Sequence, residues 1–513
     1  PGTSLEIIPT ITGIATESRD VDSMKNINSP TPEFELTQKE AQIGLTLGWG
    51  VTNSLTLNGT INPDFSTVET DAPQIDINEP FAIFYPEKRP FFTEGIDFFR
   101  TPLDLVYTRN IRDPSWGAKL TGKEGANTMA AFLTSDELTN LIIPGVESST
   151  LVSMNSPSLA SVLRYSRDFG RASKIGAIAT LREGDEYFNR VAGADANIRL
   201  TGKDTITAQF LGSQTQYPSH VAEDNDQLSE TIDGTALKLH YSHAERSFEA
   251  CAGYDDISDG FRADLGFIPQ VGYRGAHTSG RYIWYPKNGW FSRLWIGPAL
   301  TARRDQRGDH LRDRVDVTMF MEGGLQSQLQ TRVAREKVSY NGAEFDLTWT
   351  SFYGQMKPTS DLVVGLDLRV GDHIDYANTR PGERLHVLPS MRYFVGRRLQ
   401  FALAHTFERM VVDEGELYTA NITRLTAIYQ LTPRTRLKAV IDGVDYRYNV
   451  DLYNDERDPR DRGLATQVLF SYRINPQTSI FAGYNDRYSG NDELGLNQSD
   501  RSVFLKVGYA WAL

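Results

Sequence analysis

Apolar and polar residues alternate one by one along much of the chain, and the last segment, RSVFLKVGYAWAL, shows this most clearly. One face of the segment collects apolar and aromatic residues, namely Val503, Leu505, Val507, Tyr509, Trp511 and Leu513. The other face carries Phe504, Lys506, Gly508, Ala510 and Ala512. A period of two residues is typical of a β-strand with one apolar face, so the segment is predicted to be a strand.

Short turn signals recur along the whole chain and divide it into pairs of such strands. Eleven of them begin at Thr52, Lys123, Gly170, Gly202, Ala244, Pro286, Gly323, Lys357, Gly396, Thr432 and Asn475. After the first interval, the spacing of roughly 33 to 46 residues fits two strands of about ten to fourteen residues and one longer loop. The pattern predicts an all-β chain of about 24 strands, between about 22 and 26.

The distribution of polar loops and aromatic residues favours a membrane barrel. Polar, acidic loops alternate with the short turns, and aromatic residues that suit a membrane interface cluster near strand ends: Tyr282, Trp284, Tyr285, Trp290, Trp295, Tyr509 and Trp511. We therefore expect one transmembrane antiparallel β-barrel over residues 1–513, in a bacterial outer membrane, surrounded by lipid and lipopolysaccharide, with both termini periplasmic. The main alternative is a soluble sandwich, propeller or solenoid, but no blade-like sequence repeat is present.

Composition agrees with this interpretation. The chain has 513 residues, one cysteine and a net charge of -13, which argue against a disulfide framework and against non-specific binding of nucleic acid. Its mean hydropathy of -0.40 suits a barrel, whose strands average apolar and polar faces. The sequence has no apolar run long enough for a transmembrane helix. It opens at Pro1 without a signal peptide, so we expect a mature or trimmed chain.

One interval does not fit the regular spacing. Residues 63–115 form an insertion after the third predicted strand, and we expect them to fold into the lumen as a plug or constriction, because an ordered loop of this length and aromatic content needs a surface to pack against. The residues expected there are Phe81, Phe84, Tyr85, Glu87, Lys88, Arg89, Phe91, Phe92, Glu94, Arg109 and Arg112. Acidic residues precede basic ones, from Asp64, Glu69 and Asp71 to Arg109, which predicts ion pairs.

The insertion also carries a family resemblance. The stretch NPDFSTVETDAPQIDINEPFAIFYPEKRPFFTEGIDFF, followed by PLDLVYTRNIRDPSWGAKLTGKEG, resembles the hallmark of the bacterial DUF5916 family. The resemblance implies a large C-terminal outer-membrane-type region. Members of the family also resemble proteins with an N-terminal module similar to family 9 carbohydrate-binding domains, and this sequence shows no such module.

Candidate chemistry is sparse. No nucleophile elbow, phosphate-binding loop or zinc-protease motif is present, so an enzyme is not expected. No cofactor is expected either, except that Asp255, Asp256 and Asp259 form a weak calcium candidate, since oxygen donors cluster there without cations nearby in the sequence. Arginines on strands are expected to face the lumen or lie near the rims: Arg164, Arg167, Arg303, Arg304, Arg312, Arg314 and Arg369.

Three functions remain open at this point. The first is a plugged or gated conduit for a solute, a polymer or an exported polypeptide. The second is a sealed barrel that anchors a protein partner at its mouth. The third is an outer-membrane hydrolase. The conduit is favoured because anchoring requires only a small barrel, whereas about 24 strands enclose a wide lumen.

Overall fold

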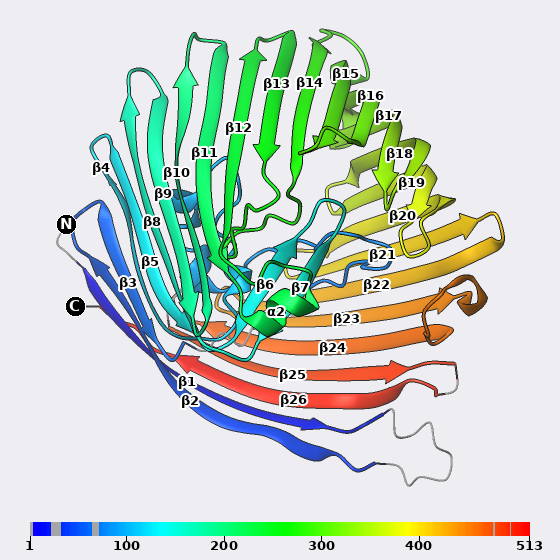
Figure 1. Ribbon diagram of the computed structural model, residues 1–513. Helices are drawn as coiled ribbons and strands as arrows, with labels where there is room; N and C mark the ends of the chain where they lie inside the picture. The colour runs from blue at the N-terminus through cyan, green and yellow to red at the C-terminus, as the bar shows by residue number, and fades with distance from the viewer. Residues whose placement is uncertain (1–3, 22–31, 64–70, 476–477, 493, 513) are drawn as a thin grey trace.

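The chain forms one closed antiparallel β-barrel of 24 strands (Figure 1), as the alternating pattern predicts. The computed structural model describes residues 4–21, 32–63, 71–475, 478–492 and 494–512. The first strand closes the barrel by pairing with β26, with Ile14 opposite Phe504. The predicted fold class, a single large transmembrane barrel with a lumenal insertion after the third strand, is confirmed.

The strands of the first half of the barrel are β1 (Leu5–Ser18), β2 (Glu35–Gly50), β3 (Leu55–Ile61), β4 (Pro114–Glu124), β5 (Asn127–Asp136), β8 (Ser158–Phe169), β9 (Ser173–Gly184), β10 (Tyr187–Arg199), β11 (Asp204–Gln216), β12 (Ile232–Ala244), β13 (Phe248–Ile257) and β14 (Tyr273–Trp284).

The second half comprises β15 (Phe291–Asp305), β16 (His310–Gly323), β17 (Ser327–Tyr340), β18 (Ala343–Thr359), β19 (Leu362–Asp375), β20 (Arg380–Val395), β21 (Leu399–Val412), β22 (Gly415–Thr432), β23 (Thr435–Tyr448), β24 (Arg460–Arg473), β25 (Ser479–Gly490) and β26 (Asn497–Gly508). The short β27 (Trp511–Ala512) continues the pairing of the last strand with β1.

Strand alternation places apolar side chains outside and a mixed set inside. On β26, Val503 and Leu505 are 58% and 51% exposed on the outer face, whereas Phe504 between them is 6% exposed and faces inward. On β5 the inward residues are buried beneath other parts of the chain, among them Phe132. The outer face therefore has the apolar character that lipid requires, and the lumen is partly filled.

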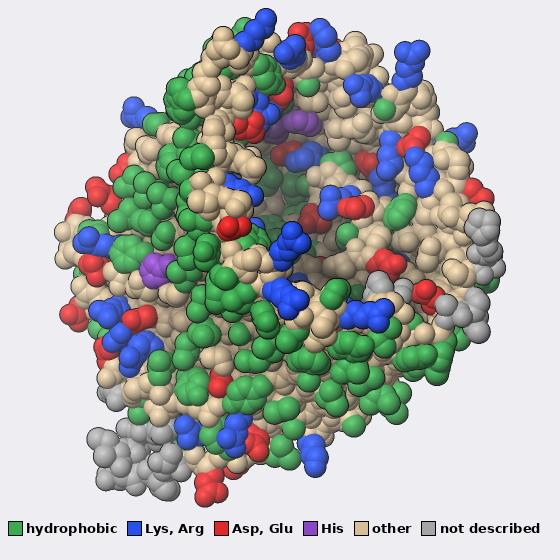
Figure 2. All heavy atoms as spheres, turned by 180° about the vertical axis from the view of Figure 1, so that it is seen from behind, with side chains coloured by type: hydrophobic (Ala, Val, Ile, Leu, Met, Phe, Trp, Pro, Cys, Tyr) green, Lys and Arg blue, Asp and Glu red, His purple; other side chains and the backbone are tan. Residues whose placement is uncertain are grey.

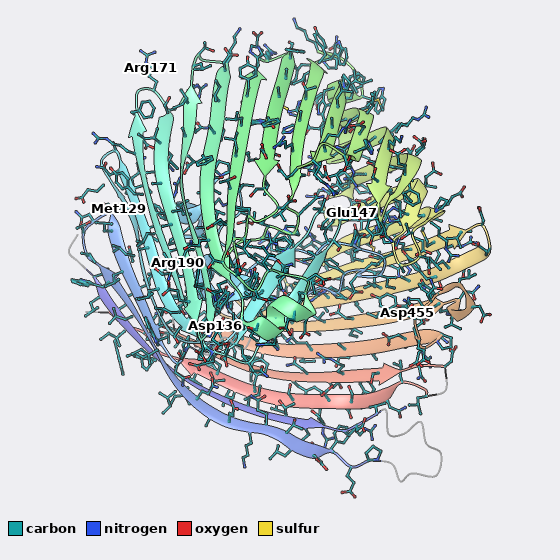
Figure 3. All side chains as sticks on the ribbon, in the orientation of Figure 1. Met129, Asp136, Glu147, Arg171, Arg190 and Asp455 are labelled. Atoms are coloured by element: carbon teal, nitrogen blue, oxygen red, sulfur yellow. The ribbon has the colours of Figure 1, made fainter. Side chains whose placement is uncertain are left out.

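The eleven predicted short turns all join barrel strands at one end, which we call the short-turn end. The opposite end, the long-loop end, carries the longer connections together with tight turns such as 185–186 and 341–342. Arg171 in a short turn and Asp455 in a long loop lie at opposite ends, and Glu147 lies inside the ring of strands (Figure 3). The first strand begins, and the last ends, at the short-turn end.

In the described part of the chain, segments from the long-loop end occupy the lumen. The first, called the insert, consists of the described residues 62–63 and 71–113, with α1 (Pro90–Thr93) and the 3₁₀ helices η2 (Ile96–Phe99) and η3 (Thr108–Asn110). The second is the hairpin of β6 (Thr139–Pro144) and β7 (Ser149–Met154), which forms its own two-stranded sheet. The third is the loop 258–272, which packs beside the insert.

The remaining helices are short. They are α2 (Ser219–Asp224), which lies inside the ring near β6 and β7 in Figure 1, and the one-turn 3₁₀ helices η4 (Gly324–Gln326) and η5 (Val450–Leu452). No helix in the described part of the chain has the length and apolar character needed to cross a membrane.

Candidate functional site: the lumenal insert

The insert begins at the base of a strand pair and crosses the lumen. Ile61 on β3 pairs with Trp116 on β4, and Asn62 N–H donates to the carbonyl of Ser115, so the two strands remain joined where the insert leaves the wall. Within 71–113 only short helices form. Pro90 occupies the first turn of α1, which suits proline because no backbone donor is needed there.

One arm of the insert, residues 71–80, contacts the wall formed by β19 to β23. Ile75 and Ile77 pack against a buried cluster that includes Met410 and Tyr418. Asn78 Nδ2 donates to the carbonyl of residue 374, and its Oδ1 accepts from the amide of residue 376, both at 2.8 Å. Glu79 lies 3.5 Å from Arg384 on β20. A few polar contacts and two isoleucines thus hold this arm.

The middle of the insert is held by aromatic contacts. Phe84, Tyr107 and Phe267 form a triangle of rings whose centroids are 5.0 to 5.2 Å apart. Tyr107 Oη accepts from the amide of Tyr85 at 3.0 Å and donates to its carbonyl at 2.9 Å. These contacts fix the predicted aromatic stretch against the loop 258–272 rather than against lipid. Phe81 is partly buried.

Arg89 organises the turn into α1. It is 6% exposed, pairs with Glu87 at 2.6 Å and donates to the carbonyls of Ile111 (2.7 Å) and Thr108 (2.6 Å). Its guanidinium also lies over the ring of Phe92 at 4.5 Å. Burial by itself would raise the pKa of Glu87, but the hydrogen bonds and charge of Arg89 outweigh burial and lower it. The pair is therefore held in its charged form.

The other arm packs on the wall formed by β4 to β11. Phe92 and Phe99 contact Phe132, with ring centroids 6.4 and 5.5 Å apart, inside a cluster that extends to the loop 258–272. Lys119 on β4 donates to the carbonyls of Phe91 and Glu94. This arm is more extensively buried than the first, so the insert is anchored unequally on the two sides of the lumen.

The predicted ion pairs form in part. Asp71 pairs with Lys88 at 2.9 Å and with Arg109, which joins the acidic start of the described insert to its basic end. Asp64 and Glu69 lie outside the described residues. The Arg112 and Glu94 side chains are exposed, and Arg112 contributes its amide, which donates to Asp136 at 3.1 Å.

Arg182 on β9 links two lumenal segments to the wall. Its side chain is fully buried, as is that of Asp136, and the two are 2.9 Å apart. Its other donors reach the carbonyls of Asn110 in the insert (3.1 Å) and Asn140 in β6 (2.7 Å), and Ser158 Oγ (3.1 Å). No sequence pattern pointed to Arg182, because its partners are distant along the chain.

The other two lumenal segments were not expected. The stretch DDISDGFRAD, residues 255–264, reads as one of the polar, acidic outer loops, but Phe261 within it and Leu265 after it are buried in the lumen. Asp264 there accepts hydrogen bonds from Tyr187 (2.7 Å) and Tyr217 (3.1 Å). The apolar runs in TNLIIP and STLVSM, on either side of a Pro-Gly turn, were the available signal for β6 and β7.

We expect Asp264 to make stability depend on pH in a particular direction. Burial raises the pKa of its carboxyl above the ordinary value, against the opposing effects of the Tyr187 and Tyr217 hydrogen bonds and of the Arg182 and Arg262 charges. The Asp264 carboxyl therefore keeps its proton up to a higher pH in the folded chain than in the unfolded chain, where the pKa of an aspartate is about 3.9. The stability that protonation contributes is fully present at pH values below the pKa of the unfolded chain. It is lost as the pH rises through the pKa of the folded chain.

The test compares the wild type with Asp264→Asn by urea unfolding at several pH values. As pH falls, the free energy of unfolding of the wild type should rise relative to that of the variant. Asp97→Asn is the control, because this carboxylate is 77% exposed and should show no such trend. A difference between wild type and Asp264→Asn that is constant with pH would contradict the assignment.

The calcium candidate gains no support from the structure. Asp255 lies 3.0 Å from Lys238 on the neighbouring strand, and Asp256 lies 3.3 Å from Arg274. These aspartates have no cations near them in the sequence, but the adjacent strands place cations beside them in the fold. In the described ranges, no group of three or more His, Cys, Asp or Glu residues is arranged to hold a metal ion, and this includes any group that contains Asp259.

Six of the seven proposed interface aromatics are exposed near the short-turn end: Tyr282, Trp284, Tyr285, Trp290, Tyr509 and Trp511. Trp295 is the exception, and its placement in the girdle was wrong. It pairs with Ile283 and stacks on Phe320 with centroids 5.6 Å apart, and Arg281 lies 4.9 Å from its ring. Its neighbour Ile296 is exposed on the outer face, so alternation turns Trp295 inward.

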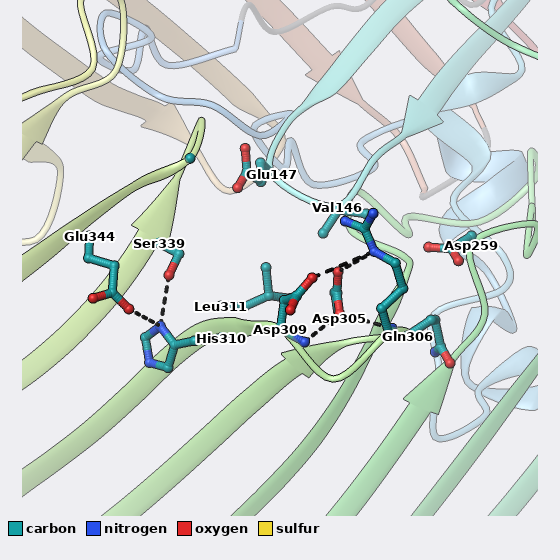
Figure 4. Close-up of a pocket in the computed structure, with 12 residues that line it drawn as sticks. Val146, Glu147, Asp259, Asp305, Gln306, Asp309, His310, Leu311, Ser339 and Glu344 are labelled. Atoms are coloured by element: carbon teal, nitrogen blue, oxygen red, sulfur yellow. Dashed lines mark hydrogen bonds and ion pairs between the residues drawn. The ribbon is translucent and has the colours of Figure 1, made fainter.

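A serine and a histidine meet at the rim of the long-loop end, beside a recess of about 770 Å³ (Figure 4). Ser339 Oγ lies 2.8 Å from His310 Nδ1, and Asp313 is 3.4 Å from His310 Nε2. Both oxygens of Asp313 accept from Arg304, and His310 Nε2 makes no hydrogen bond within the described residues. Glu344 lies 3.9 Å from His310 Nδ1, so in the described part of the chain neither carboxylate makes the hydrogen bond that orients the histidine of a hydrolase triad.

Comparison with known families agrees with this architecture. Residues 5–142 match the family described as "Domain of unknown function (DUF5916)", a match that contains the insert and the strands on either side of it. The chain is similar to this family over that region. None of the curated proteins matches the sequence significantly.

Several solved structures resemble the chain at low sequence identity. The copper transporter OprC is 10% identical with a TM-score of 0.52, over 78% of each chain. The ferric enterobactin receptor PfeA of Pseudomonas aeruginosa is also 10% identical, with a TM-score of 0.41 over 78% of this chain and 85% of its own. OmpT of Vibrio cholerae has a TM-score of 0.27, with 10% identity over 76% and 100%. The likeness to OprC shows a shared barrel fold.

Proposed function

We propose that this barrel is an outer-membrane conduit in which the insert forms a constriction that can be displaced. The observation that carries the proposal is the unequal anchoring of the insert. One arm is buried in a large aromatic core against β4 to β11, whereas the other reaches β19 to β23 through Asn78, Glu79 and two isoleucines. The lightly held arm is the part that would move.

A hollow in the surface supports the same proposal. Figure 2 shows a hollow in the face seen from behind, with acidic, basic and histidine side chains on its walls. A charged, water-accessible wall is typical of a barrel interior that passes solutes. The orientation that we propose places the short-turn end and both termini in the periplasm, and the long-loop end outside the cell. A protein partner at the barrel mouth is compatible with this arrangement.

The sealed platform is the second candidate, and the dense contacts around Arg182 favour it. Single-channel recording in planar bilayers separates the two. Asn78 has a backbone φ of +60°, so Asn78→Gly keeps a backbone conformation that glycine adopts readily while it removes both side-chain hydrogen bonds to the wall. We expect the variant to open more often, and to a larger current, than the wild type.

Asn341→Gly is the matched control for this experiment. Asn341 also has a positive φ, of +48°, but it lies in the turn between β17 and β18 and its side chain bonds to Thr379. Its currents should equal those of the wild type. Equal currents from the wild type and Asn78→Gly would mean that this arm does not gate the lumen.

A further inference from the structure

We propose that a recess in the lumen wall, formed by β14, β15 and β16, binds the anionic group of a small solute. The recess has a volume of about 280 Å³, and its lining includes His277, Arg303, Arg312 and Arg314. Arg303 lies directly opposite Arg312 across the strand pair, and Thr301 lies opposite Arg314, so the three arginines project from neighbouring inward positions. The proposal makes small anionic solutes the substrate class of the conduit. Its statement about transport rests on the proposed conduit function.

The charges around the recess are unbalanced in favour of cations. Arg312 lies 3.6 Å from Glu336, while Arg314 and Arg332 share one carboxylate, Asp316, at 3.0 and 3.6 Å. Arg303 has no carboxylate partner in the described part of the chain. Four arginines therefore share two carboxylates, although the whole chain has a net charge of -13. The acid that lines the recess, Asp255, is neutralised by Lys238 at 3.0 Å.

The wall is shaped so that these side chains lie flat around the recess. A Cβ atom on Gly253 would stand 2.1 Å from the His277 ring, and one on Gly275 would stand 3.2 Å from Cγ of Arg303. Glycine at the first position is thus required for the ring to rest on the wall. Arg303 is held in place by Gln270, which accepts at 2.8 Å, and by the ring of Tyr273 at 4.8 Å.

The guanidinium groups set the chemistry of the recess. Arg314 Nε lies 3.0 Å from Asp316 Oδ1, and Arg332 shares the same carboxylate. Guanidinium groups match phosphate and carboxylate oxygens through paired hydrogen bonds. The volume suits a compact polyanionic group better than a neutral sugar chain, since ordinary ligand sites are larger.

The test measures binding directly, without reference to conduction. Titration calorimetry on the full chain in a zwitterionic detergent would use tripolyphosphate and citrate as separate probes, which distinguish phosphate from carboxylate recognition. The double variant Arg303→Gln, Arg314→Gln should weaken binding of the preferred probe at least about tenfold. The control Arg190→Gln, Arg307→Gln removes two charges from exposed side chains outside the recess and should stay within about twofold of the wild type.

Each outcome decides a separate point. Equal binding by the wild type and the Arg303, Arg314 variant would overturn the recess as the site, and so would failure of the wild type to bind either probe. If the wild type binds a probe and the double variant does not, the recess is supported as the site. If bilayers then carry no current, only the conduit proposal fails. If current flows but neither probe binds, the conduit stands and the recess fails.

Discussion

Replacing Arg182 with methionine is expected to lower the free energy of unfolding by about 3 to 5 kcal/mol, because it leaves the carboxylate of Asp136 buried without its cation. Both side chains are fully buried. The same substitution removes the donors to Asn110 and Asn140, so the insert and the β6–β7 hairpin lose their shared anchor. Urea unfolding in detergent, followed by tryptophan fluorescence, measures the loss.

Arg190→Met provides the matched control on the neighbouring strand. Arg190 pairs with Glu183 at 2.7 Å, but its side chain is 50% exposed, and exposed pairs contribute at most about 1 kcal/mol. Limited proteolysis adds a local readout, since cleavage within the insert should become faster in Arg182→Met and remain unchanged in Arg190→Met. Equal losses of stability in the two variants would show that burial of the Arg182 pair is not what anchors these segments.

The barrel could be predicted from the sequence because its determinants are local. Each strand alternates every second residue, and each short turn carries its own polar, Gly or Pro residues, so all eleven turns were placed. The insert could be predicted because its length and aromatic content exceed what a loop needs. Trp295 could have been placed correctly by the same reasoning, since Leu294, Ile296, Pro298 and Leu300 form an apolar series out of phase with it.

The rest of the site depends on contacts between distant parts of the chain. The loop 258–272 appeared acidic and solvated because the partners of its charged residues lie elsewhere: Tyr187 and Tyr217 for Asp264, and Gln227 for Arg262. Asp255 appeared free of cations because Lys238 comes from the adjacent strand. The surroundings of these charged side chains depend on which residues meet across strands and across the lumen. A single sequence does not specify those contacts.

Removing the insert is expected to open the lumen permanently. The pairing of Ile61 with Trp116 persists to the base of the insert, so a short Gly-Ser linker in place of residues 63–113 would leave an ordinary hairpin of β3 and β4. A barrel of 24 strands without this segment should behave as a wide aqueous channel, with conductance steps at least about tenfold above those of the intact chain. Planar bilayer recording measures the difference, after a heat-modifiable gel shift has shown that the barrel is folded.

The informative comparison removes the β6–β7 hairpin instead. Asp136 on β5 pairs directly with Ser158 on β8, so residues 138–156 can also be replaced by a short turn. That deletion leaves the insert in contact with both walls, through Asn78 on one side and Phe92 on the other, and should raise conductance much less. If a folded chain without the insert carries no more current than the intact chain, the remaining loops close the lumen by themselves. The barrel would then be a sealed platform, because no displacement of the insert could open a path through it.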